Sequence, residues 1–183
     1  EPLIKLYNAY AKLGLGNNFT PWAELYYHNL RSDEFAIGTH LKYTYFNGID
    51  ELDNTQRSDG HFEVFGKKFG KRNTFEAAIA YDLSKLKYYG FSKDLSEELA
   101  KEADIDQNYN ILSADFDLSS TIRDSFNLRH KVKLGTHLLS SKRGASEFGL
   151  LALGNLSKIE NSELYNLDVS VDYNSMQNKW DSL

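Results

Sequence analysis

The stretch from Asn110 to Leu139 constrains the fold most, because two runs of alternating apolar and polar residues follow each other there. A period of two is typical of β-strands whose two faces meet different surroundings. The apolar positions of the two runs are Leu112, Ala114, Phe116, Leu118, Leu128, Val132, Leu134 and Leu138. The link between the runs, residues 119–125, is rich in turn-forming Ser and Asp and predicts a β-hairpin.

The polar positions of this hairpin carry opposite charges on its two strands. The carboxylates of the first strand are Asp115 and Asp117, and the cations of the second are Arg129, Lys131 and Lys133. Antiparallel pairing would set the two rows side by side, and opposite charges across a sheet stabilise it modestly. The hairpin is therefore expected to have one apolar face and one face with an ionic ladder.

The same alternation recurs along the chain and predicts an all-β fold, an antiparallel meander of about nine strands. The expected strands span residues 3–16, 20–31, 35–46, 61–69, 74–83, 112–119, 128–138, 148–157 and 163–174. The sequence leaves open a continuation of the fifth strand to Gly90. Residues 47–60 are expected to form a long acidic loop. Residues 94–106 are expected to form another, with one or two helical turns capped by Asp94 or Ser96. Connections that alternate between short and long are typical of meander barrels.

Composition excludes several classes of protein. The formal net charge of -5 argues against a nucleic-acid binder that works through a basic surface. The absence of Cys excludes disulfides, thiolate metal sites and Cys nucleophiles. No run of about 18 apolar residues predicts a transmembrane helix. No Gly-, Ser- or Pro-rich linker divides the chain, so residues 1–183 are expected to form a single region.

The alternation leaves open whether the apolar face meets a protein core or lipid. Three features favour lipid: strands of about 10 to 13 residues, organised rows of charge that suit a wet lumen, and Tyr at the ends of the apolar faces. These tyrosines are Tyr7, Tyr27, Tyr43, Tyr45, Tyr81, Tyr165 and Tyr173. The fold expected is thus a transmembrane β-barrel or a segment of one. The alternative is a soluble antiparallel barrel or sandwich that binds a small apolar ligand.

Four short motifs carry a resemblance to a known family. They are Tyr-x-Lys-Leu-Gly-x-Gly-Asn at 10–17, Pro-x-Ala-Glu-Leu-Tyr at 21–26, Gly-x-His-Leu-Lys at 38–42 and Phe-Gly-Lys-Lys-Phe at 65–69. In these motifs the chain resembles outer-membrane β-barrel proteins of the Bacteroidota, of the TonB-dependent-receptor-like group. The resemblance implies a larger barrel of which this chain is a portion, and it brings no catalytic residues with it.

The polar faces of the predicted strands supply the candidate lumen-lining residues. These are Glu24, His28, His40, Lys42, Asp115, Asp117, Arg129, Lys131 and Lys133. His40, with Glu24 and His28, comes nearest to a constellation, but a metal site needs three or four convergent ligands, so no metal and no cofactor are expected. No catalytic residue is expected either, because Asp115 and Asp117 are better explained as structural charges than as a glycosidase dyad.

Together these patterns predict a non-enzymatic protein of the bacterial outer membrane. Its expected role is solute passage or transport, or service as a subunit of an outer-membrane assembly. The expected partners are outer-membrane lipid and other outer-membrane chains, and no nucleic acid. A third hypothesis, a barrel esterase or phospholipase, lacks a Gly-x-Ser-x-Gly nucleophile motif.

Overall fold

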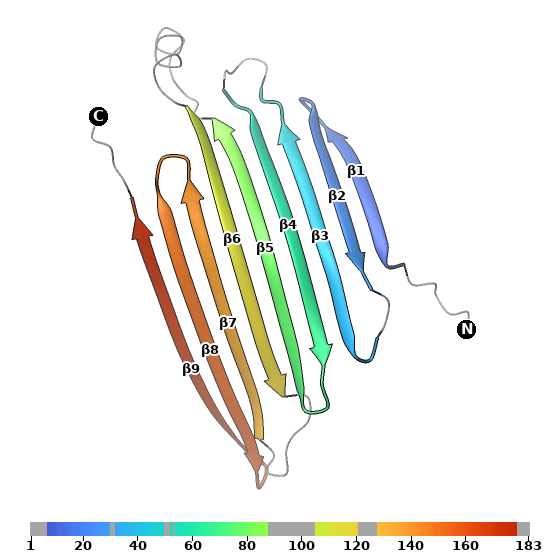
Figure 1. Cartoon of the computed structure of the whole chain (residues 1–183), viewed down its shortest axis with the longest axis vertical. Coiled ribbons are helices and arrows are strands. Elements are labelled where there is room, and N and C mark those ends of the chain that lie inside the picture. Colours follow the sequence, from blue (N-terminus) through green and yellow to red (C-terminus); the bar gives the residue numbers. More distant parts are fainter. Residues whose placement is uncertain are drawn as a thin grey trace.

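The computed structural model describes residues 7–29, 32–49, 52, 54–87, 105–120 and 128–178. In this part of the chain nine strands form one antiparallel sheet in the order of the sequence (Figure 1). The strands are β1 (Ala9–Gly16), β2 (Thr20–His28), β3 (Phe35–Phe46), β4 (Arg57–Phe69), β5 (Asn73–Lys87), β6 (Asp106–Ser120), β7 (Leu128–Ser141), β8 (Ser146–Glu160) and β9 (Glu163–Gln177). The predicted all-β meander is confirmed. No helix in these ranges is long and apolar enough to span a membrane.

Strand boundaries follow backbone pairing more closely than the apolar pattern. β3 has the predicted bounds, but β4 begins at Arg57, so the expected loop over 47–60 is too long. β5 and β6 also extend past their alternating segments, because each has paired neighbours on both sides and the backbone ladder continues into polar residues. Of residues 94–106, where helical turns were expected, the structure describes only Ile105 and Asp106, and Asp106 begins β6.

The predicted strand over 20–31 ends early, at His28. Asn29 follows it and pairs with β3 through both its backbone and its side chain. Its backbone N–H donates to the Ile37 carbonyl at 2.9 Å. Its Oδ1 accepts a hydrogen bond from the Ile37 backbone N–H at 2.7 Å, and its Nδ2 donates to the Phe35 carbonyl at 3.1 Å. These bonds tie the end of β2 to the start of β3, a role that suits Asn near a turn.

The strand register gathers the apolar positions on one face of the sheet. Residues that pair across an antiparallel ladder share a face. One such row runs through Leu25, Leu41, Phe62, Tyr81, Leu112, Leu138 and Phe148. The two faces are named here the apolar face and the polar face.

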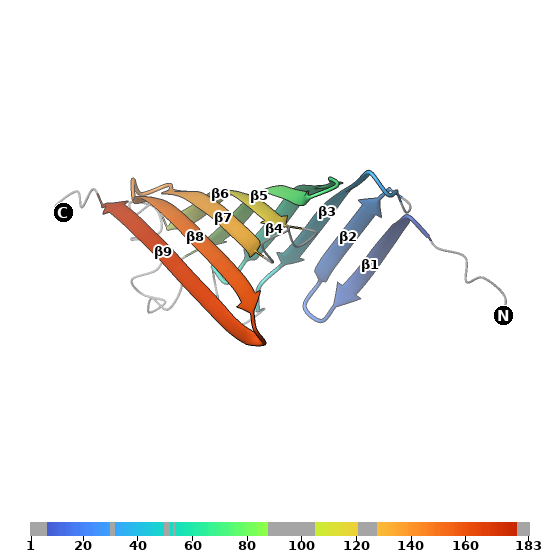
Figure 2. The ribbon, with the colours of Figure 1, turned by 90° about the horizontal axis from the view of Figure 1, so that it is seen from below.

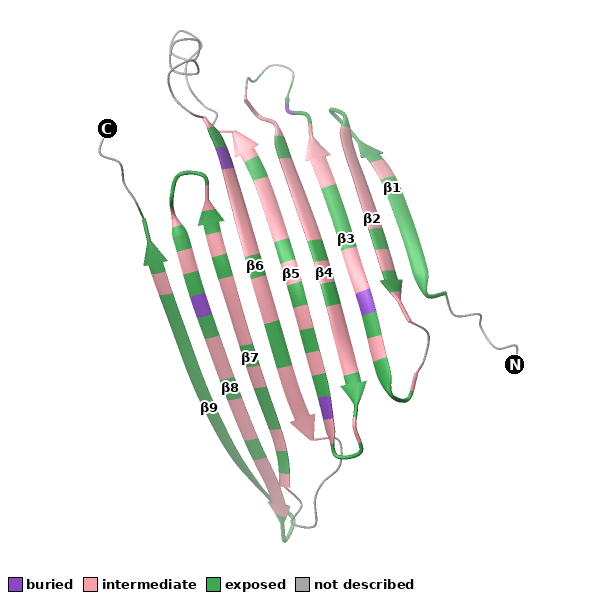
Figure 3. Cartoon of the chain, viewed as in Figure 1, coloured by how far each residue is buried: buried purple, intermediate pink, exposed green. Residues whose placement is uncertain are grey.

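The apolar face has no covering layer within the described residues. None of their hydrophobic side chains is buried, and Ile79 at the middle of β5 is 58% exposed. Figure 2 shows that the sheet is bowed, and Figure 3 shows exposed and half-buried positions alternating along the strands. The half-buried positions are mostly those of the polar face, which is therefore the more enclosed side of the sheet.

The sheet is open. β1 and β9 lie at opposite edges and pair only with β2 and β8 (Figure 1). The described strands therefore do not close into a barrel. Because every neighbouring pair is antiparallel, β1 and β9 run in the same direction.

Two of the tight turns contain residues with positive φ angles. Asn161 and Ser162 have φ angles of 50° and 69° and join β8 to β9 in a two-residue turn. Two positive φ angles are the requirement of a type I′ hairpin. Asn18 and Phe19, at φ 54° and 49°, lie in the turn that joins β1 to β2.

Candidate functional site

The polar face holds all the residues predicted to line a lumen. The register places Glu24 directly opposite Lys42, and Asp117 directly opposite Lys133. The other members share this face: His28, His40, Asp115, Arg129 and Lys131. The face is thus built from opposite charges on adjacent strands.

The predicted ionic ladder between β6 and β7 is present. Lys131 Nζ lies 3.2 Å from Asp117 Oδ2, and Lys133 Nζ lies 3.7 Å from Asp115 Oδ1. Both pairs are diagonal, because the residue opposite Asp117 in the register is Lys133. The Asp117 side chain is only 19% exposed, so this carboxylate is held close to the sheet. The ladder neutralises two of the three cations predicted on this strand.

Glu24 is the centre of a second polar cluster. Its Oε1 accepts a hydrogen bond from the Tyr10 hydroxyl at 2.8 Å and lies 3.0 Å from His40 Nε2. Lys12 Nζ lies 3.6 Å from its other oxygen. The predicted proximity of Glu24 and His40 is therefore confirmed.

His28 does not belong to this cluster. The Tyr26 ring lies near both histidines, with its centroid 5.6 Å from that of His28 and 6.0 Å from that of His40. His28 Nδ1 lies 2.7 Å from the Asn29 carbonyl oxygen instead. The expected grouping of His28 with His40 and Glu24 is wrong, because the strand register sets Tyr26, and not His28, opposite His40.

Three residues that were not predicted as site residues extend the cluster into β4 and β5: His61, Glu63 and Asp82. The His61 ring packs edge-on to His40 with centroids 5.5 Å apart, and its Nδ1 lies 2.7 Å from Asp82 Oδ1. Its Nε2 lies 4.0 Å from Glu63 Oε2. The available signal was the His-x-Glu spacing on one strand, since residues i and i+2 share a face. The polar cluster thus runs from β1 to β5.

The ligand atoms of His40, His61 and Glu63 all lie within 4.8 Å of one another. No metal site was predicted, because the predicted grouping drew its residues from β2 and β3 only, whereas two residues of β4 complete this trio.

Glycines on the polar face let aromatic rings lie against the sheet. A Cβ added to Gly38 would be 2.5 Å from Phe65 Cζ, so the ring occupies the space that a side chain would need. Trp22 covers Gly14 and His137 covers Gly149 in the same way. These close approaches explain why glycine interrupts strands that otherwise favour β-branched and aromatic residues.

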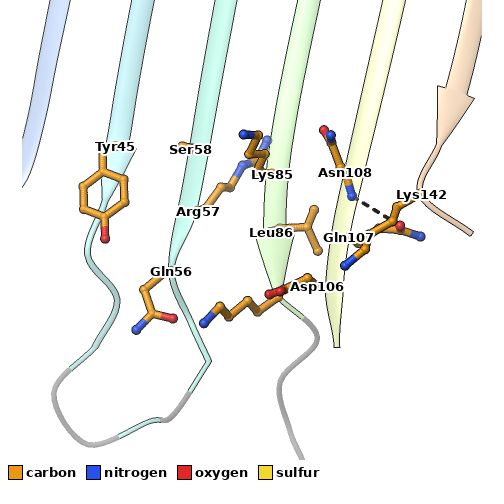
Figure 4. Close-up of a pocket in the computed structure, with 11 residues that line it drawn as sticks. Tyr45, Gln56, Arg57, Ser58, Lys85, Leu86, Asp106, Gln107, Asn108 and Lys142 are labelled. Atoms are coloured by element: carbon orange, nitrogen blue, oxygen red, sulfur yellow. Dashed lines mark hydrogen bonds between the residues drawn. The ribbon is translucent and has the colours of Figure 1, made fainter. Parts of the chain in front are cut away.

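A groove lies at one end of the sheet, across the ends of β4, β5 and β6 (Figure 4). It is lined by Tyr45, Gln56, Arg57, Ser58, Lys85, Leu86, Lys87, Asp106, Gln107, Asn108 and Lys142. Arg57 is held by Asp59 through hydrogen bonds of 2.7 and 3.0 Å. The lining contains more cations than carboxylates, a composition that favours anionic groups.

Comparisons with protein-family models, with curated proteins and with solved structures found no match.

Proposed function

We propose that this chain is part of a bacterial outer-membrane β-barrel that acts without catalysis, in solute passage or as a subunit of an outer-membrane assembly. The observation that carries the proposal is an apolar face that extends over the whole sheet while no hydrophobic residue in the described ranges is buried. Soluble monomers rarely expose an apolar patch larger than a few hundred Å². Against lipid, such a face does not incur the free-energy penalty of exposing apolar surface to water.

The dimensions of the apolar band fit a bilayer. On β5 the band runs from Phe75 to Leu83, about 27 Å along the strand at ~3.4 Å per residue. With the strand inclined by about 30°, an angle that the strand register sets, the height of the band is roughly 24 Å. The apolar band of outer-membrane barrels is about 25 Å tall.

The inclination follows from the register. The centre of the apolar band lies between Thr39 and Leu41 on β3, and at Val169 on β9. The residue of β3 that is in register with Val169, followed through the pairs of β3 to β9, is Phe35. The centre therefore shifts by about five residues, or roughly 17 Å, across strand spacings that total about 29 Å. The strands are thus inclined by about 30° to the band's normal, near the ~35–45° tilt of transmembrane barrel strands.

Tyrosines near the band ends have polar partners for their hydroxyl groups. Tyr81 donates to Asn110 Oδ1 at 2.7 Å, and Tyr165 donates to Glu163 Oε2 at 2.7 Å. A ring on the apolar side with a bonded hydroxyl suits the boundary between lipid and water.

The connections differ between the two ends of the sheet. At one end they comprise residues 17–19, 47–56, 88–105 and 142–145, and at the other 29–34, 70–72, 121–127 and 161–162. The two longest share one end, and outer-membrane barrels have longer loops on the extracellular side and short turns on the periplasmic side.

Closure of the proposed barrel needs further strands. β1 and β9 run in the same direction, so joining them directly would give a parallel pair. An antiparallel barrel requires an even number of strands. We propose that an odd number of additional strands, from this polypeptide or from another outer-membrane chain, pairs with the two edges.

The proposal is tested by placing a fluorescent label on each face of β5. The chain contains no Cys, so Ile79→Cys and Ala80→Cys each provide a single labelling site at adjacent positions. Ile79 lies on the apolar face and Ala80 on the polar face. After refolding into lipid vesicles, lipid-borne quenchers should quench the label at position 79 and leave that at position 80 unaffected.

Two outcomes would overturn the proposal. One is equal, weak quenching of both labels. The other is a folded chain that stays monodisperse in plain buffer, by sedimentation, and does not partition into vesicles. The second outcome would favour a soluble sheet protein whose apolar face holds an apolar ligand.

A further inference from the structure

We infer that His40, His61 and Glu63 form a binding site for a divalent transition-metal ion of the zinc class on the polar face. His61 and Glu63 are separated by one residue on β4 and so point to the same side of the sheet. His40, on β3, is directly opposite Glu63 in the register. Their ligand atoms already lie within 4.8 Å of one another.

Each histidine contacts a carboxylate on the neighbouring strand that lies away from the other histidine: β2 for His40, and β5 for His61. His40 Nε2 lies 3.0 Å from Glu24 Oε1, and His61 Nδ1 lies 2.7 Å from Asp82 Oδ1. In each ring this contact engages one nitrogen, and a metal would bind the other. Metal-binding histidines typically donate their second ring N–H to a carboxylate, which fixes the ring and raises its basicity.

The distances suit an ion better than a direct hydrogen bond. His61 Nε2 and Glu63 Oε2 are 4.0 Å apart, which is too long for a hydrogen bond. Ligand atoms around a tetrahedral zinc lie about 3.4 Å apart, given bonds of about 2.0–2.1 Å. Rotation of the Glu63 side chain, which is 32% exposed, would bring its carboxylate closer to His61 Nε2.

The donor set determines the class of ion. Two imidazoles and one carboxylate favour zinc, nickel or copper, whereas magnesium and calcium prefer oxygen donors only. The three side chains are between 25% and 32% exposed, so an ion can enter from solvent and keep a water as its fourth ligand. The site belongs to the polar face and does not depend on what medium the apolar face meets.

The test uses the full chain, in whichever medium keeps it monodisperse, with Co²⁺ as a spectroscopic probe and Zn²⁺ as competitor. We expect one Co²⁺ per chain, with the visible absorption of a tetrahedral site that Zn²⁺ abolishes. His61→Gln and Glu63→Gln should each remove this absorption, and Asp82→Asn should weaken binding by about 10- to 100-fold. Two ligand variants are used so that a folding defect in one, seen by circular dichroism, leaves the other informative.

His137→Gln is the matched control. His137 lies on the same face and pairs with Glu147 at 3.2 Å, but it is outside the cluster. Its loss should leave Co²⁺ affinity unchanged. Absence of Co²⁺ and Zn²⁺ binding by the unmodified chain would overturn the inference. So would folded His61→Gln and Glu63→Gln variants that bind as tightly as it does.

Discussion

An arginine at position 79 should destabilise the folded chain far more than an arginine at position 80. Ile79 is the middle residue of the apolar band on β5, and it pairs with Val64 and Ala114 on the neighbouring strands. Its side chain is 58% exposed, so Ile79→Arg creates no clash within the sheet. The effect of the substitution therefore reports the medium on the apolar face.

The magnitude differs sharply between the two media. In hydrocarbon, an Arg at the bilayer midplane costs about 2–4 kcal/mol, and near the interface about 0–1 kcal/mol. In water, an exposed substitution usually changes stability by less than about 0.5 kcal/mol. Leu83→Arg serves as the depth control, because Leu83 ends the band and Lys85 follows it on the same face. Ala80→Arg serves as the face control, since it places the cation opposite Glu63.

The assay is urea unfolding of the chain refolded in lipid vesicles, followed by tryptophan fluorescence. We expect the transition midpoint of Ile79→Arg to fall well below those of Leu83→Arg and Ala80→Arg, with an unchanged slope. If all three variants unfold at the same urea concentration, the apolar face does not meet hydrocarbon and the reasoning fails.

Three further predictions concern the sheet itself, each measured as a shift in the denaturant midpoint. Gly38→Ala should lower the free energy of unfolding by about 1–3 kcal/mol, because the added Cβ would lie 2.5 Å from the Phe65 ring. Gly60→Ala should have almost no effect, since its nearest neighbour would be 3.8 Å away. Equal effects of the two substitutions would contradict this explanation. Asp117→Asn should cost about 0.2–1 kcal/mol through loss of the pair with Lys131, and 1 M salt should shrink the difference; a salt-independent loss would show that the pair is not its cause. Ser162→Gly should stabilise by about 1 kcal/mol, since the φ of 69° strains a residue with a side chain, and a lowered midpoint would refute that explanation.

Much of the sheet could be predicted because alternation is a local property. The bounds of β3 match since its apolar positions alternate from end to end. The ladder of Asp117 with Lys131 was predictable because a short link joins its two strands, which limits the possible pairings. The start of β4 at Arg57 was not predictable, because the residues there are polar and show no alternation. They belong to the strand because they pair with β3 and β5.

The site was only partly predictable, because pairing between strands, and not a local pattern, brings its residues together. Glu24 and His40 were recognised because they lie on consecutive strands. His61 and Asp82 come from strands farther along the chain, and their positions depend on two more registers. Shifting one register by two residues would keep every face intact and separate these side chains.

The amino-acid sequence by itself determined that the chain forms strands and which residues share a face, because a period of two depends only on neighbouring residues. Tertiary structure alone decided which polar side chains meet, that the sheet stays open over the described ranges, and that its polar face is the more enclosed side. Those features depend on strand register and on curvature, which arise from pairing between segments far apart in the chain.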